Sequence, residues 1–293
     1  MVFSPPDDPP ARVAVVTVSY GSETVLAQFL ASAPAAANCN LCIVVADNKP
    51  AERSEVADQS RNAGARYLPL LTNLGYGGAM NAAVETLPAS IEWVLISNPD
   101  VVLGEGSIDS LVRAGDSDPL IGAVGPRILT SEGSVYPSAR SIPSLRTGVG
   151  HALFANLWLA NPWTREYRRD TDEAPRRREA GWLSGSCVLV RRSLFDTLGG
   201  FDPRFFMYFE DVDLGYRIGQ MGYRNVYEPS AVVTHTGAHS TATESARMIR
   251  AHHDSARRFL DKKYPGALLW PVRTALGTGL RVRSAIVASR SQH

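Results

Sequence analysis

Four short apolar runs, separated by polar segments, dominate the first 120 residues of the chain. After the first run, Ser22 precedes apolar residues at helical spacing, which predicts an amphipathic helix with Ser22 as its N-cap. Nearly continuous apolar strands that alternate with helices predict an α/β fold, with a mostly parallel central sheet and helices on both faces. The runs are residues 13–20, 41–48, 65–71 and 93–96, and the helical positions are Val25, Leu26, Phe29 and Leu30.

The pattern changes after residue 120, where shorter strand-like segments at 122–129, 181–191 and 225–235 are separated by longer loops. No internal repeat is visible. Residues 13–264 are therefore predicted to form one domain around a single sheet. A flexible arm rich in proline and acid is expected before it, at residues 1–12, and a basic amphipathic tail after it, at residues 265–293.

Acidic side chains follow two of the predicted parallel strands. Asp47 lies at the end of the second strand, and Asp100 closes the sequence Asn98-Pro99-Asp100 after the fourth. Pro99 cannot donate a ladder hydrogen bond, so the strand must end there. Because parallel strands point their carboxyl ends the same way, both acids are expected to face one ligand-binding crevice. The tripeptide is equally compatible with a simple turn.

A glycine-rich turn at residues 73–81 enters another predicted helix. Its backbone N–H groups can approach a nucleoside or a diphosphate closely, and the nearby Asp47 carboxylate can accept the ring N–H of uracil or thymine. The glycine spacing is not the dinucleotide-binding fingerprint, and no P-loop lysine follows. A glycine turn without a ligand has the same pattern. The candidate ligand contacts are Asn73, Gly75, Gly78 and Asn81.

Three carboxylates open a helix after an aromatic lead-in at residues 205–209. Glu210, Asp211 and Asp213 occupy its first turn, Asp213 is spaced to pair with Arg217, and Gly222 marks the end. A carboxylate in this position can accept a proton or meet a metal-bound substrate. Acids in a first turn can also simply complement the helix dipole. The apolar positions that predict the helix are Leu214, Ile218 and Met221.

The chain has 293 residues, 44% of them hydrophobic, and a formal net charge of +1, which is typical of a globular enzyme-sized protein. No nucleic-acid partner is expected, and a homo-oligomer is compatible with the sequence. Cys39, Cys42 and Cys187 lack the spacing of a disulfide framework or a zinc site, which predicts a reducing compartment and no structural zinc. The N-terminus lacks the pattern of a signal peptide, so export is not expected.

No stretch approaches the roughly 20 consecutive apolar residues that a membrane-spanning helix needs. Two segments nevertheless have an interfacial composition, residues 151–163 and the tail from Leu268 onward, where apolar residues alternate with arginines. The tail is expected either to attach the protein to an anionic membrane surface or to pack on the domain with its arginines in solvent.

Taken in order, these segments resemble inverting glycosyltransferase family 2, from the first strand to about His239. The resemblance implies a GT-A fold with a C-terminal helical extension, in which residues 13–120 bind the nucleotide and residues 121–264 bind the acceptor. The motifs that carry it are Thr17-Val18-Ser19-Tyr20, Asp47-Asn48, the turn at 73–81, Asn98-Pro99-Asp100, Trp182-Leu183-Ser184-Gly185-Ser186, Gly199-Gly200-Phe201-Asp202 and Glu210-Asp211-Val212-Asp213-Leu214.

The resemblance also implies the roles of individual residues on the donor side. Asp100 matches the final acid of the family's Asp-x-Asp motif and, with His235, implies a divalent cation site. Asn98 departs from that motif, which makes it an expected contact to the ribose or to the outer shell of the metal. Mn²⁺ or Mg²⁺ fits oxygen-rich coordination, and one imidazole slightly favours Mn²⁺. Further implied donor contacts are Thr17, Ser19, Tyr20, Asp47 and the turn residues Asn73, Gly75, Gly78 and Asn81.

On the acceptor side, Asp211 matches the family's general base, which takes the acceptor hydroxyl proton as that oxygen attacks the anomeric carbon. The indole of Trp182 can stack on a pyranose ring or simply fill the core. The implied acceptor contacts are Trp182, Ser184, Gly185, Glu210 and Asp213.

Within the family, the chain is most similar to bacterial rhamnosyltransferases. This implies transfer of L-rhamnose from dTDP-rhamnose to polyprenyl-diphosphate-linked N-acetylglucosamine in cell-wall linker assembly, by a cytoplasmic enzyme on the inner face of the cell membrane. Another dTDP- or UDP-sugar transferase and a non-catalytic nucleotide-sugar-binding protein are the alternatives. A sugar-phosphate nucleotidyltransferase or a nicotinamide-dependent oxidoreductase would need phosphate-binding motifs that the chain lacks.

Overall fold

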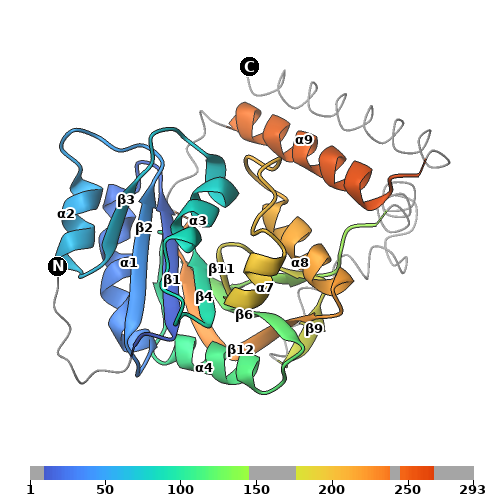
Figure 1. Ribbon diagram of the computed structural model, residues 1–293, viewed down its shortest axis with the longest axis horizontal. Coiled ribbons are helices and arrows are strands. Elements are labelled where there is room, and N and C mark those ends of the chain that lie inside the picture. Colours follow the sequence, from blue (N-terminus) through green and yellow to red (C-terminus); the bar gives the residue numbers. More distant parts are fainter. Residues whose placement is uncertain (1–9, 145–175, 238–244, 267–293) are drawn as a thin grey trace.

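A sheet of ten strands forms the centre of the structure, a computed structural model that describes residues 10–144, 176–237 and 245–266 (Figure 1). The strand order is β3-β2-β1-β4-β11-β6-β12-β5, with β7 beside β6 and β9 beside β12, while β8 and β10 form a separate pair. The strands are β1 (Val13–Ser19), β2 (Leu41–Asp47), β3 (Arg66–Pro69), β4 (Trp93–Ser97), β5 (Val101–Leu103), β6 (Ile121–Thr130), β7 (Val135–Tyr136), β8 (Ala139–Arg140), β9 (Arg178–Ala180), β10 (Trp182–Leu183), β11 (Cys187–Arg191) and β12 (Arg224–His235).

The first four strands are mutually parallel, and the later strands extend the same sheet. Strand β11 lies antiparallel between β4 and β6, and β12 runs parallel to β6. The register places Ser19 opposite Asp47 and Thr17 opposite Ser97. The carboxyl ends of β1, β2 and β4 therefore lie together at one edge of the sheet, where the polar motifs begin.

Helices cover both faces of the sheet, and alternate residues of each central strand belong to different cores. In β1, Val13 and Val15 pack with one set of helices, whereas Ala14 and Val16 pack with the other. The first set is α1 (Glu23–Ala36), α2 (Glu55–Asn62) and α4 (Ser107–Asp116), and the second is α3 (Gly75–Glu85), α7 (Arg192–Thr197) and α8 (Glu210–Gln220). The predicted α/β fold with helices on both faces is confirmed.

Helix α9 (Ser245–Lys263) lies across α8 and the loop that precedes it (Figure 1). Its fully buried Phe259 packs against Phe205 and Val212, and the rings of Phe209 and Tyr216 lie 5.8 Å from the Phe259 ring. Ser255 donates a hydrogen bond of 2.9 Å to the Met207 carbonyl. An aromatic cluster therefore anchors α9 to the start of the acid-rich helix α8.

Local details differ from the sequence-based expectations at two places. The segment predicted as one strand at 181–191 is divided into β10 and β11 by a turn at residues 184–186. Ser22 precedes α1 as predicted, but its side chain makes no cap; its hydroxyl accepts a hydrogen bond from the Tyr20 N–H instead. The arm up to residue 9, the interfacial segment 151–163 and the tail from residue 267 lie outside the described residues.

Within the part of the chain that the structure describes, no helix combines the length and the apolar character that crossing a bilayer requires.

Candidate active site

Polar side chains gather at the sheet edge where β1 and β2 end, but most of them are covered. Asp47 is 1% exposed, and its carboxylate accepts hydrogen bonds from the Lys49 N–H and the Tyr67 hydroxyl. Thr17 and Ser19, both predicted to contact the donor, have no exposed surface. Tyr20, by contrast, is 53% exposed and is available to a ligand.

The glycine-rich turn is held against the sheet by Asn48. Its side-chain amide donates to the Gly75 carbonyl and accepts from the Leu74 N–H, while Asn73 accepts from the Gly75 N–H within the turn. Gly75 has a φ of 73°, and a Cβ there would lie 2.2 Å from the Phe206 carbonyl oxygen. The close approach that requires this glycine is therefore to the protein's own backbone, not to a ligand as predicted.

Two other residues of the turn also pack inside the protein. The amide of Asn81 bonds to both the N–H and the carbonyl of Phe201. A Cβ on Gly78 would lie 3.0 Å from the side chain of Leu74, the residue that precedes α3. The Asn81 bonds fix α3 to the loop that contains Phe201, whereas the predicted donor contacts of Asn81 and Gly78 stay predictions.

Three predicted site residues lie close together. Asn98 and Asp100 follow β4, and His235 is the last residue of β12. The Nε2 atom of His235 lies 3.0 Å from Asp100 Oδ1 and 3.4 Å from the side-chain amide of Asn98. The Asp100 carbonyl accepts hydrogen bonds from both the N–H and the hydroxyl of Thr236, which fastens the turn to β12. The structure therefore brings together the three residues predicted to bind the metal or the ribose, although they are separated widely in the sequence.

This cluster supplies some, but not all, of the ligand atoms that a divalent cation needs. A carboxylate and an imidazole suit Mn²⁺ or Mg²⁺ when oxygens of a bound diphosphate complete the coordination. Among the described residues, no group of three or more His, Cys, Asp or Glu side chains forms a complete metal centre. Asp100 and His235 thus fit a metal that is bound together with the donor.

The turn at residues 184–186 joins the Asp100 cluster to Asp211. The Ser186 carbonyl accepts a 2.9 Å hydrogen bond from the Asn98 N–H, and the Gly185 N–H donates a 3.0 Å bond to Asp211 Oδ2. A Cβ on Gly185 would lie 3.4 Å from the Asp211 Cβ, so the turn and the acid are in van der Waals contact. One short turn therefore sets the position of the acid in α8 relative to the residues that follow β4.

Asp211 is oriented by its own helix as well as by this turn. Its Oδ1 accepts a 2.8 Å hydrogen bond from the Val212 N–H. The two preceding residues, Tyr208 and Phe209, have φ values of 67° and 68°. Left-handed backbone in non-glycine residues costs on the order of 1–3 kcal/mol each and persists where the surroundings enforce it. The packing of Phe209 against α9 supplies that enforcement immediately before the acid.

The environment of α8 raises the pKa values of its first two acids. Burial raises the pKa of Glu210 to about 8, with the charge of Asp211 adding to the effect, and one of its carboxyl oxygens is buried without a hydrogen-bond partner. Burial also raises the pKa of Asp211, while the Gly185 and Val212 N–H groups oppose that rise. Glu210 therefore holds a proton at neutral pH, and a raised pKa makes Asp211 a better proton acceptor.

Tyr76 lies beside this pair and was not recognised as a site residue from the sequence. Its hydroxyl donates a 2.6 Å hydrogen bond to the Gly185 carbonyl. Burial, followed by the charges of Glu210 and Asp211, raises the pKa of Tyr76 well above its usual range, so the hydroxyl keeps its proton. Asn48 was likewise missed as a positioning residue. Both lie within motifs of the family resemblance, and only the fold reveals their partners.

Asp213 and Trp182, both predicted to contact the acceptor, make structural contacts instead. Asp213 has no exposed surface and pairs with Arg217 at 2.7 Å and with Lys262 at 2.6 Å. The Trp182 indole N–H donates to the Ser141 carbonyl, and the Arg140 guanidinium lies 5.7 Å from the centre of its ring. The structure does not support an acceptor contact for Asp213, and Trp182 shares its aromatic face with an arginine.

Comparison with known proteins gives matches over nearly the whole chain. The family model described as "Glycosyltransferase like family 2" matches residues 9–253. The N-acetylglucosaminyl-diphospho-decaprenol L-rhamnosyltransferase of Mycobacterium tuberculosis is 44% identical over 286 residues, which cover 94% of this chain and 93% of that protein. A rhamnosyltransferase of Escherichia coli K12 is 26% identical over 86% of this chain and 93% of its own length.

A solved structure has the same architecture. The mannosyltransferase of Pyrobaculum calidifontis, in complex with GDP-Man and Mn²⁺, superposes with a TM-score of 0.55 at 17% identity, over 95% of this chain and 77% of that one. At this identity the likeness concerns the fold alone, and it confirms the expected GT-A architecture.

Proposed function

The chain belongs to glycosyltransferase family 2, and we propose that it transfers L-rhamnose from dTDP-rhamnose to N-acetylglucosamine carried on a polyprenyl diphosphate. The observation that carries the proposal is the turn at residues 184–186, which is hydrogen-bonded to Asn98 on one side and to Asp211 on the other. This turn supports a mechanism in which a metal-diphosphate site and a proton acceptor lie close together, as a single displacement at an anomeric carbon requires.

We assign the role of general base to Asp211. Its Oδ atoms are fixed by the N–H groups of Gly185 and Val212, so the carboxylate is oriented before the acceptor arrives. It takes the proton of the attacking acceptor hydroxyl as the new glycosidic bond forms and the bond to the nucleoside diphosphate breaks. A positioned base of this kind contributes typically 10²–10⁴-fold to the rate.

Asp100 and His235 would hold the cation together with the donor diphosphate. When bound, Mn²⁺ or Mg²⁺ would supply positive charge that stabilises the departing nucleoside diphosphate. The donor nucleoside would lie along the edge formed by β1 and β2, where Tyr20 is exposed and Asp47 is 1% exposed. The Asp47 carboxylate, which accepts one hydrogen bond on each oxygen, has capacity for a thymine ring N–H, but the side chain would first have to become accessible.

We further propose that the enzyme acts in the cytoplasm, attached to the inner face of the cell membrane, in the assembly of a cell-wall linker. The prenyl chain of the acceptor lies in the bilayer, so the site has to reach the membrane surface. The arginine-rich tail from Leu268 onward would provide that attachment, each basic residue near an anionic surface contributing about 1 kcal/mol.

The donor assignment predicts selective stabilisation by dTDP-rhamnose. In thermal unfolding with Mn²⁺, dTDP-rhamnose at a hundred times its dissociation constant should add about 2.7 kcal/mol of stability, and this gain should disappear with EDTA. UDP- and GDP-linked sugars at the same concentration should give smaller shifts. An equal or larger shift with a UDP-linked sugar would contradict the donor assignment.

A second readout separates a transferase from a protein that only binds the nucleotide sugar. Free dTDP should accumulate from dTDP-rhamnose when a lipid-linked N-acetylglucosamine acceptor is added. If dTDP-rhamnose stabilises the protein but no dTDP is released with acceptor present, the chain binds the donor without transferring it.

A further inference from the structure

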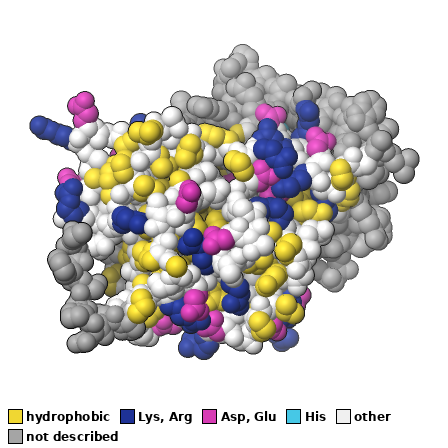
Figure 2. Space-filling view, in the orientation of Figure 1, with side chains coloured by type: hydrophobic (Ala, Val, Ile, Leu, Met, Phe, Trp, Pro, Cys, Tyr) yellow, Lys and Arg dark blue, Asp and Glu magenta, His cyan; other side chains and the backbone are white. Residues whose placement is uncertain are grey.

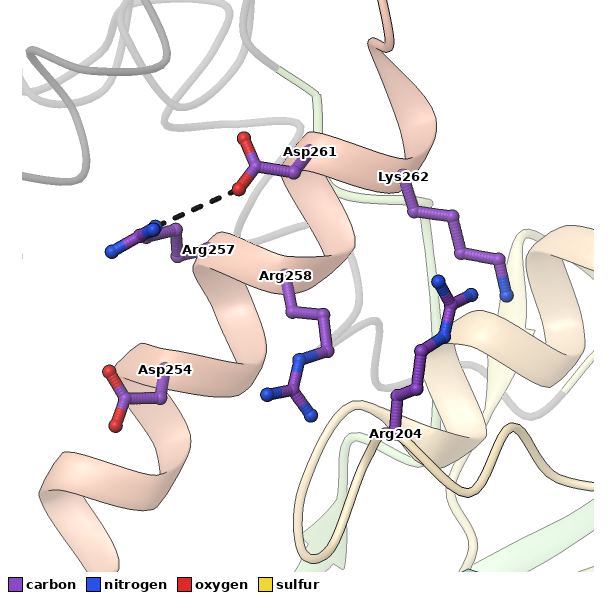
Figure 3. A pocket seen from close by; sticks show the side chains of 6 residues that line it. All are labelled: Arg204, Asp254, Arg257, Arg258, Asp261 and Lys262. Carbon is purple, nitrogen blue, oxygen red and sulfur yellow. Dashed lines mark ion pairs between the residues drawn. The ribbon is translucent and has the colours of Figure 1, made fainter.

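A cationic cavity lies between α9 and the loop that precedes α8 (Figure 3). Its volume is about 420 Å³, within the range of ligand sites of small molecules. Lysine and arginine side chains gather in this part of the surface, together with a few acids (Figure 2). The residues that line the cavity are Arg204, Asp254, Arg257, Arg258, Asp261 and Lys262.

The side chains of the cavity differ in how far their charges are already compensated. Arg258 is exposed, points into the cavity, and has no hydrogen-bond or ion-pair partner among the described residues (Figure 3). Arg204 shares Asp202 with Lys262 while remaining 62% exposed. Arg257 turns outward to Asp261, at 3.7 Å. Positive charge without a fixed counterion is therefore found at Arg258, whereas the exposed Arg204 guanidinium is bonded to Asp202.

The cavity is connected directly to the first turn of α8. Lys262 forms part of the cavity wall, and its Nζ lies 2.6 Å from Asp213 Oδ1 and 2.7 Å from Asp202 Oδ2. Asp213 is two positions beyond Asp211 in the same turn. The cationic side chains of α9 thus lie beside the first turn of α8, the turn that also carries Asp211, the proposed general base.

We propose that this cavity binds the diphosphate of the lipid-linked acceptor, with Arg258 and Arg204 as the main contacts. The proposal rests on the proposed function, because an N-acetylglucosamine bound at Asp211 carries its diphosphate directly on the sugar and presents it to the neighbouring surface. Arginine forks match phosphate oxygens in bidentate geometry. Lys262 forms part of the wall, but its charge is compensated by Asp202 and Asp213.

The test compares two acceptors that differ only in charge: N-acetylglucosamine linked through a diphosphate to a short prenyl chain, and N-acetylglucosamine on a neutral alkyl chain. Initial rates are measured in neutral detergent with saturating dTDP-rhamnose and Mn²⁺, without phospholipid. In Arg258→Ala, the ratio of kcat/KM for the diphosphate acceptor to kcat/KM for the neutral acceptor should fall about tenfold or more. The fall should come from a higher KM for the diphosphate acceptor, as expected for a lost charged hydrogen bond. Arg258→Lys keeps the charge, and its kcat/KM ratio should lie between those of Arg258→Ala and the wild type.

Arg61→Ala is the control, since this exposed arginine of α2 pairs with Asp58 and does not line the cavity. This variant should change the ratio of the kcat/KM values for the two acceptors by less than about twofold. An unchanged ratio in Arg258→Ala, with wild-type transfer to the diphosphate acceptor intact, would refute the proposed cavity function but not the transferase. Absence of transfer by the wild type would instead contradict the proposed function itself.

Two further outcomes would assign the anion to another source. If Arg258→Ala weakens binding of dTDP in the absence of acceptor, the cavity recognises the donor diphosphate, and the proposal is wrong. If the variant differs from the wild type only when anionic phospholipid vesicles are added, the cavity contacts lipid headgroups, and the proposal is equally wrong.

Discussion

Asp211→Asn is expected to lower the turnover number of sugar transfer by about a hundredfold or more, with near-native binding of dTDP-rhamnose. The asparagine keeps the size of the side chain, and its single amide oxygen can accept one of the two hydrogen bonds that the Gly185 and Val212 N–H groups make to Asp211. It cannot take a proton. In the proposed mechanism, donor binding relies on the separate cluster around Asp100. Single-turnover rates with saturating acceptor, together with calorimetric titration of the donor, measure the two effects independently.

Glu210→Gln is the matched control for this substitution. Because burial raises the pKa of Glu210 to about 8, the native side chain is protonated at neutral pH, and glutamine imitates that neutral form. We expect it to retain most of the turnover. The outcome that would reassign the base is near-native transfer by Asp211→Asn combined with a large loss in Glu210→Gln.

Asp100→Ala should abolish metal-dependent binding of dTDP while the fold remains intact. The substitution removes one of the two side chains that fit the cation, and it leaves the backbone bonds from Thr236 to the Asp100 carbonyl in place. Titration of dTDP with Mn²⁺ and with EDTA should give the same weak affinity in the variant, whereas the wild type should bind more tightly with Mn²⁺.

His235→Ala should produce a loss in the same direction, because Nε2 of His235 lies 3.0 Å from Asp100. Glu105→Ala, which removes an exposed acid close by in the sequence, is the control and should leave the affinity unchanged. Undiminished metal-dependent affinity of Asp100→Ala for dTDP would show that the cation is held elsewhere.

The sequence was sufficient to predict the layers of the fold and the edge at which the site lies. Apolar strands that alternate with helices have few stable arrangements, and parallel strands necessarily bring their carboxyl ends together. Asp47 and Asp100 could therefore be placed at one edge. The pair Asp213–Arg217 was likewise predictable, because a spacing of four residues on a helix makes the side chains neighbours.

The contacts that complete the site could not be predicted in the same way, because they join distant segments. Strand β11 enters the sheet antiparallel to β4, which brings Ser186 to Asn98, and the packing of α8 against β10 brings Asp211 to Gly185. No local pattern encodes these contacts. The division of residues 181–191 into two strands follows from the same turn.

Several residues were assigned to ligands because the sequence cannot show what fills the space around them. A glycine with positive φ is required by close approach of any atom, and at Gly75 that atom is the Phe206 carbonyl oxygen. Asn81 bonds to Phe201, 120 positions away. The hydroxyls of Thr17 and Ser19 are polar but buried. Residue type indicated a close or polar contact in each case. Which atom makes that contact depended on the tertiary fold.

The structure of the reaction product tests the account most directly. The protein is incubated with dTDP-rhamnose, Mn²⁺ and N-acetylglucosamine on a prenyl diphosphate, and the product is analysed by mass spectrometry and by NMR of the anomeric centre. The proposed mechanism uses one general base and no protein nucleophile. It therefore predicts the addition of a single deoxyhexose with inverted anomeric configuration relative to the donor. Failure to transfer the sugar, or a product with retained configuration, would contradict the account.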